Sequence, residues 1–103
     1  MDTLGQVVRR AREEQGISQR ALCLRVGVSS GYLSRLENDH AGYTGSEGSC
    51  IRIADALGLD RDELMRLAGH LPSDIEQFIL ENPKELKNLR RKVKRATAQR
   101  SQS

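Results

Sequence analysis

One glycine between two short segments of helical periodicity constrains this chain more than any other feature. It is Gly27, within the stretch from Gln19 to Asn38, QRALCLRVGVSSGYLSRLEN. Apolar or small residues recur at helical spacing on both sides of it: Leu22, Cys23, Val26, Leu33 and Leu36. Glycine ends a helix readily because it takes the left-handed conformation without a Cβ penalty. Two short helices joined by a tight glycine turn are a helix-turn-helix, whose second helix can enter the major groove of DNA.

The second of these helices has a polar outer face. Its outward positions are Ser30, Gly31, Ser34 and Arg35. Ser29 or Ser30 can accept a hydrogen bond from the free N–H groups that open the helix, and Val28 is the apolar plug beneath the turn. The amide groups at this helix start would hold DNA phosphates. Arg35 could contact guanine N7 and O6 together, and Gly31 allows close approach of the backbone.

A longer pattern surrounds this motif. It comprises Ile17-Ser18-Gln19, Leu22, Cys23, Gly27-Val28-Ser29 and Tyr32-Leu33-Ser34-Arg35-Leu36-Glu37. In this order of small, apolar and polar positions, the chain resembles the Cro/phage-repressor type of helix-turn-helix, often called the XRE family, from about Leu4 to Ala68. The resemblance implies a five-helix domain and a transcriptional repressor that binds its operator as a homodimer. It also implies that Gln19 reaches the DNA backbone.

The predicted DNA-binding residues follow from these two lines of reasoning. They are Gln19, Ser29, Ser30, Gly31, Tyr32, Ser34, Arg35 and Asn38. For Tyr32 two alternatives stay open, packing on the helix or donating its hydroxyl to a phosphate. A dimer would need an inverted-repeat operator, because protein two-fold symmetry is mirrored in the half-sites.

Two residues and one loop depart from the family pattern. Asp39 stands where a glycine is usual, and the loop from Asp39 to Ser46 is slightly longer than usual and lacks the usual proline. Leu24 is apolar at a position that faces solvent in the family, so it marks either a contact with another chain or nothing.

The remaining helices follow from periodicity and caps. The spacing of Leu4, Val7, Val8 and Ala11 predicts a helix over residues 2–15. Arg9, Arg10 and Arg12 would point partly outward from it. Ser46 would cap a fourth helix that ends at Gly58, and Asp60 with Glu63 would form a capping box for a fifth.

A helical extension is expected after a break around Pro72. Ser73 would cap a sixth helix, and Pro83 suits the first turn of a seventh. The apolar residues of both helices predict a dimerisation surface: Ile75, Phe78, Ile79, Leu86, Leu89 and Val93. The two helices are expected to pack together, with the seventh either dimerising or lying along DNA. The predicted class is thus all-α, with a helix-turn-helix domain at 1–70, the extension at 71–98 and a disordered tail at 99–103.

Charge is unevenly distributed along the 103 residues. Residues 1–36 carry six arginines against three acids, and residues 37–83 carry three arginines against ten acids. Residues 84–103 carry eight lysines and arginines against Glu85 alone. Blocks of like charge attract partners of opposite charge, so the basic pieces favour double-stranded DNA and the acidic piece should face away from it.

The sequence argues against several other classes of function. It has no glycine-rich phosphate loop, no paired carboxylates in apolar context and no cluster of metal ligands, so neither an enzyme nor a cofactor or metal is expected. Cys23 and Cys50 lie on apolar helix faces and are expected to be free thiols. No apolar run approaches the roughly 18 residues of a membrane span, which favours a cytoplasmic protein. The alternative to a repressor is a protein-interaction module on the same fold that no longer binds DNA specifically.

Overall fold

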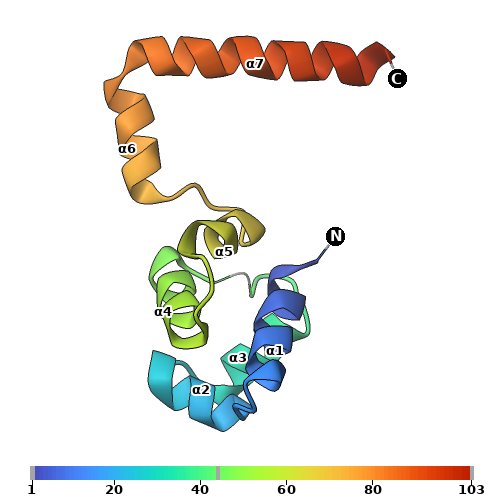
Figure 1. Ribbon diagram of the computed structural model, residues 1–103, viewed down its shortest axis with the longest axis vertical. Coiled ribbons are helices and arrows are strands. Elements are labelled where there is room, and N and C mark those ends of the chain that lie inside the picture. The colour runs from blue at the N-terminus through green and yellow to red at the C-terminus, as the bar shows by residue number, and fades with distance from the viewer. Residues whose placement is uncertain (1, 44, 103) are drawn as a thin grey trace. The chain divides into compact units, whose positions relative to one another are not determined.

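The computed structural model describes residues 2–43 and 45–102, and within these residues every regular element is an α-helix, as predicted (Figure 1). Its helices are α1 (Leu4–Glu14), α2 (Gln19–Val26), α3 (Ser30–Glu37), α4 (Glu47–Leu57), α5 (Arg61–Leu67), α6 (Ser73–Glu81) and α7 (Pro83–Gln102). The chain divides into two units. The first ends at Leu71 and contains α1 to α5, and the second begins at Pro72 and contains α6 and α7.

The start of α1 lies two residues later than predicted because Thr3, not Asp2, shapes it. Thr3 Oγ1 accepts from the Gln6 N–H at 3.2 Å, and Gln6 Oε1 accepts from the Thr3 N–H at 3.0 Å. This reciprocal pair is a capping box, which fixes Leu4 as the first helical residue.

The turn between α2 and α3 forms as its residues predict. Gly27 has a φ of 73°, in the left-handed region that favours glycine. Of the two candidate serines, Ser29 is the cap, since its Oγ accepts from the Tyr32 N–H at 3.1 Å. Ser30 is therefore the first residue of α3, and its side chain is exposed.

The caps of α4 and α5 are also the predicted residues, with one difference. Ser46 Oγ accepts from the Ser49 N–H at 3.2 Å, and Asp60 Oδ1 accepts from the Glu63 N–H at 2.9 Å. The reciprocal half of the capping box at α5 does not form, because the Glu63 carboxylate pairs with Arg66 instead.

The apolar faces of α1 to α5 meet in one core. Its buried residues are Leu4, Val8, Ala11, Leu22, Cys23, Val26, Leu33, Leu36, Cys50, Ile53, Ala54, Leu57, Leu64, Met65 and Ala68. Helix α3 packs on α1 and α2, while α4 packs on α1, α2 and α5. Burial raises the pKa of both the Cys23 and the Cys50 thiol, so these cysteines are protonated core residues without thiolate character.

Helix α1 approaches the end of α3 so closely that only glycine fits at position 5. A Cβ there would lie 2.4 Å from the Leu36 carbonyl oxygen and 2.8 Å from that of Glu37. Both distances are well inside van der Waals contact, and both neighbours are backbone atoms that cannot rotate away. Gly5 thereby fixes the position of α3 against α1.

In the second unit, α6 and α7 meet at a sharp bend (Figure 1). Asn82 makes the bend: its Nδ2 donates to the Phe78 carbonyl at 2.7 Å, and its own carbonyl accepts from the Glu85 N–H at 2.9 Å. The prediction that Ser73 caps α6 is wrong, because Pro72 occupies the cap position and Ser73 is already helical.

The apolar stripes of α6 and α7 are not buried against each other, contrary to expectation. Phe78 is 55% exposed, Leu86 and Val93 are each 50% exposed, and α6 has no buried residue. The bend at Asn82 is the cause, since it turns α7 away from α6 (Figure 1). The stripes remain available to another chain.

Helix α7 also continues beyond the predicted end at Ala98. The helix includes residues 99–102, so the expected disorder of 99–103 is wrong for these four, and Ser103 lies outside the described residues. Ala96, Ala98, Gln99 and Arg100 are good helix formers, and Thr97 Oγ1 donates to the Val93 carbonyl at 2.9 Å. The high helix propensity of these residues therefore keeps the polar end of α7 helical.

Candidate nucleic-acid interface

Helix α3 separates its buried face from its exposed face cleanly. Leu33 and Leu36 are buried, while Ser30, Gly31 and Arg35 are exposed. Ser34 is half-buried, and the Ser29 hydroxyl is occupied in capping the helix. Three of the four positions predicted to face outward are thus exposed, and Ser34 is only partly so.

Arg35 is the longest exposed side chain on this helix. Its Cζ lies 5.4 Å from the centroid of the Tyr43 ring, within range of a cation–π contact. A Cβ on Gly31 would lie 3.4 Å from Arg35 Nη1, so the guanidinium extends back along the helix over Gly31. The missing side chain at position 31 gives it that room.

Tyr32 is half-buried and faces the loop that follows α3. Its ring centroid lies 5.9 Å from that of Tyr43, with the ring planes tilted by 59°. The hydroxyl lies beside Gly45, because a Cβ built there would be 3.4 Å from it. Tyr32 therefore packs against the loop, and its contact with a phosphate stays a prediction.

A shallow hollow of about 580 Å³ lies between the starts of α3 and α4. Ser29 and Ser46, the caps of the two helices, both line it, together with Tyr32 and His70. One ring nitrogen of His70 lies 2.9 Å from the Gly45 carbonyl oxygen, within hydrogen-bond distance. Two helix N-termini that open onto one hollow both favour an anion there.

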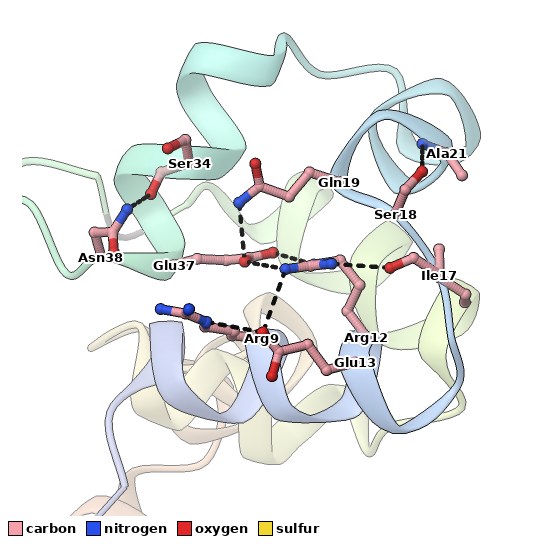
Figure 2. Close-up of polar contacts among 10 residues, drawn as sticks. All are labelled: Arg9, Arg12, Glu13, Ile17, Ser18, Gln19, Ala21, Ser34, Glu37 and Asn38. Carbon is pink, nitrogen blue, oxygen red and sulfur yellow. Dashed lines mark hydrogen bonds and ion pairs between the residues drawn. The ribbon is translucent and has the colours of Figure 1, made fainter.

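Beneath α3 lies a buried ion pair that was not predicted from the sequence (Figure 2). Arg12 donates from Nε to Glu37 Oε2 at 2.8 Å and from Nη2 to Glu37 Oε1 at 2.9 Å. The Glu37 side chain is 1% exposed and that of Arg12 is 11% exposed. The hydrogen bonds to Glu37 raise the pKa of Arg12 further above its ordinary value.

Arg12 was predicted to point partly outward, and this prediction is wrong. Its spacing carries the signal that could have found it, since Arg12 follows the buried Val8 by four residues and so shares the inner face of α1. Its Nη1 donates to the Ile17 carbonyl at 2.9 Å, which also secures the chain between α1 and α2.

Gln19 joins the same network from the first turn of α2. Its Nε2 donates to Glu37 Oε1 at 3.1 Å, and the residue is half-buried (Figure 2). A side-chain amide has two donor hydrogens, so one remains for another acceptor. Glu37 thus orients Gln19 as well as Arg12.

Asn38 and Asp39 close the end of α3 in different ways. Asn38 Nδ2 donates back to the Ser34 carbonyl at 2.8 Å, which uses that side chain within the helix end. Asp39 has a φ of 57°, which explains why glycine is usual here. Its carboxylate offsets the cost of this backbone conformation, because it accepts hydrogen bonds from Thr3 Oγ1 at 2.8 Å and from the Gly5 N–H at 3.2 Å, at the positive end of α1.

The arginines of the first unit fall into two groups. Arg9, Arg10, Arg12, Arg61 and Arg66 pair with acids. Four others are exposed and make no ion pair with any described carboxylate: Arg20, Arg25, Arg35 and Arg52. The uncompensated positive charge therefore lies on α2, α3 and α4.

Metal-ligand clusters and membrane-spanning helices were both sought in the described part of the chain. Residues 2–43 and 45–102 hold no group of three or more His, Cys, Asp or Glu side chains that could hold a metal ion. None of the helices described is both long and apolar enough to span a bilayer.

Comparisons with known proteins agree with this geometry. Residues 3–67 match the family model described as a helix-turn-helix domain. Among solved structures, the chain is similar to one from a SinR protein/SinI protein complex, at 20% identity and a TM-score of 0.56, over 93% of this chain and 99% of that chain. At this identity the likeness shows a shared fold. A search of curated proteins finds no match.

Proposed function

The chain belongs to the family of helix-turn-helix domains, which bind DNA, and we propose from this premise that it is a sequence-specific repressor acting as a homodimer on an inverted-repeat operator. The family indicates a regulator rather than an enzyme. The observation that carries the proposal is the outer face of α3, where Arg35 is exposed, forms no ion pair with a described carboxylate and lies over Gly31, which has no side chain.

Base recognition falls to the exposed side of α3. Arg35 donates to guanine N7 and O6 in the major groove, a bidentate contact worth about 1–3 kcal/mol of discrimination. Ser30 and Ser34 supply shorter donors and acceptors, and Gly31 lets the backbone approach the base edges. Because few long side chains leave this helix, the shape of the DNA contributes to specificity.

Phosphate contacts fix the register of α3 in the groove. The start of α3 borders the hollow through its cap Ser29, and the N–H groups of its first turn that the cap leaves free would bind a phosphate there. Gln19 offers its remaining amide hydrogen to a phosphate while Glu37 holds the other. These contacts position the protein without reading sequence.

The exposed stripes of α6 and α7 supply the dimer contact in this proposal. Exposed apolar residues recur along both helices: Ile75, Phe78, Leu86, Leu89 and Val93, with Ile79 half-buried. Contiguous apolar surface of this kind is unusual on a monomer and marks an interaction site. The similar solved structure is itself a complex of two proteins, which supports a protein partner for this chain.

The test is selection of binding sites from random duplex DNA, followed by footprinting and titration of the selected site. The expected product is an inverted repeat with half-site centres about 10 base pairs apart, or a multiple of that spacing. Arg35→Ala should weaken binding by about 1–3 kcal/mol and relax the preference at one base pair in each half-site.

A second function, a protein-interaction module without specific DNA binding, is favoured by the same exposed stripes. Selection that enriches no sequence would support that alternative and refute the repressor. Unchanged affinity and selectivity in Arg35→Ala would remove Arg35 from the interface.

A further inference from the structure

Helix α7 carries two different faces. At about 100° per residue, the apolar residues Leu86, Leu89 and Val93 share one side. On the opposite side, five basic residues fall within a sector about 100° wide. We call them the basic face of α7: Lys84, Lys87, Arg91, Lys94 and Arg95.

The basic face is not neutralised within the described chain. All five side chains are exposed, and none forms an ion pair with a described carboxylate. Arg91 makes one long hydrogen bond of 3.5 Å, from its Nη1 to Asn88 Oδ1. Glu85, the single acid of α7, falls on the apolar side of the helix and leaves the basic face free of negative charge.

This arrangement suits a polyanion that meets the helix from one side. From Lys84 to Arg95 the basic face runs about 16 Å along the helix. Duplex DNA carries one phosphate charge for about every 1.7 Å of its axis, so it offers several phosphates over that length. The spacing of Lys and Arg on one sector allows them to contact those phosphates together.

A lipid surface fits this helix less well. An amphipathic helix on a membrane buries its apolar face in the lipid, with its cationic residues at the headgroups. Membrane binding of such a helix scales with the apolar area that it buries, and the stripe of α7 has only three large apolar side chains, Leu86, Leu89 and Val93, along twenty residues. Contact with phosphates needs no apolar burial, so the helix suits DNA better than a bilayer.

We propose that the basic face of α7 is a second DNA-binding surface, which contacts phosphates without reading sequence. This proposal rests on the proposed DNA binding of the first unit. It leaves the apolar stripe on the other side of α7 free for a second copy of the chain, so dimerisation and phosphate contact use different residues of one helix.

The experiment measures how the affinity of the full chain for a random-sequence duplex of roughly 30 base pairs depends on salt, by fluorescence anisotropy. The face variant is Lys87→Gln, Arg91→Gln and Arg95→Gln. Its matched control is Arg90→Gln, Lys92→Gln and Arg100→Gln, which removes the same one lysine and two arginines from outside the basic face. Glutamine keeps high helix propensity in both, and circular dichroism with light scattering verifies helix content and oligomeric state.

The face variant should lower the slope of log affinity against log salt by about 0.9 for each phosphate that the helix no longer neutralises, and by up to about 2.7 in all. The control should keep the slope close to that of the unmodified chain. A slope unchanged in the face variant, or lowered equally in both, would overturn the proposal, because an equal reduction reflects net charge alone.

Two further outcomes separate the possible failures. The first is binding to lipid, measured by sedimentation with phosphatidylserine vesicles. If the face variant no longer sediments with the vesicles, the control still does, and the DNA slope of the face variant is unchanged, the basic face binds lipid and the proposal is overturned. An unmodified chain that fails to bind the duplex at low salt would refute the proposed function too. If the unmodified chain binds the duplex and the face variant keeps the same salt slope, only the proposal for the basic face is refuted.

Discussion

The two units of this chain use the same kinds of residue in opposite ways. In the first unit, which ends at Leu71, apolar side chains of five helices converge on one core. Five of its nine arginines pair with acids, and the most buried acid, Glu37, is bound by two partners. In the second unit, the apolar stripe and the basic face both remain exposed. Residue types that stabilise the fold in the first unit remain exposed in the second, where they can contact a partner.

The largest effect should come from breaking the pair that most clearly belongs to the fold. Glu37→Ala leaves the guanidinium of Arg12 buried without its acid, and removing one partner of a buried pair costs about 3–5 kcal/mol. We expect a decrease of this size in the free energy of unfolding, measured by urea titration.

The control for Glu37 is an exposed ion pair that shares no residue with the buried one. Asp55→Ala removes the partner of Arg61, and these side chains are 51% and 59% exposed. Its cost should stay within about 1 kcal/mol, as is usual for solvent-exposed pairs. Equal costs in the two variants would contradict the distinction between buried and exposed pairs.

A smaller effect should follow from crowding the contact between α1 and α3. Gly5→Ala places a methyl group against two carbonyl oxygens, and overpacking of this kind costs about 1–3 kcal/mol. Gly48→Ala is the matched control, since a Cβ at that helical position meets nothing within 4 Å. It should stabilise the protein by about 0.4–1 kcal/mol. Thermal unfolding that shifts in the same direction for both variants would show that close approach does not matter at Gly5.

The smallest effect on stability should come from the second unit. Leu86→Asp with Leu89→Asp places charges on surface that is already exposed, so the unfolding of the first unit should change by no more than about 0.5 kcal/mol. Light scattering should nevertheless give a monomer in place of a dimer. A variant that stays dimeric would place the interface elsewhere, and Leu24, 77% exposed on α2, is the first residue to test next.

The elements of the first unit were predictable because local rules and tertiary structure agree there. Gly27 and Gly58 end helices in the left-handed conformation, and Ser18, Ser46 and Asp60 cap the helices that follow them. At each of these helix ends, the residue present is of a type that favours the backbone geometry or the cap hydrogen bond found there. The outer face of α3 followed from the same periodicity.

The buried ion pair was not predictable from residue type alone. Arg12 and Glu37 lie 25 positions apart, and charged residues on a helix are usually solvated. Only the packing of α1 on α3 brings them together and removes water from both.

In the second unit, the elements were predictable but their contacts were not. The apolar spacing of α6 and α7 is real, yet the direction taken at Asn82 depends on backbone geometry that no periodicity encodes. At the end of α7 the prediction was wrong about the element itself. The polarity of residues 99–102 suggested disorder, but their helix propensity favours the helix that is observed.

The separation of α3 into two faces has a consequence for how such a regulator changes its target. Leu33, Leu36 and Glu37 are buried and hold the helix in place, whereas Ser30, Gly31 and Arg35 are exposed and contribute nothing to the core. Substitutions at the three exposed positions can therefore accumulate, or be engineered, without a compensating change in the interior. A duplicated copy of this domain could therefore change the residues that it presents to DNA through a few codons, while the core residues stay the same.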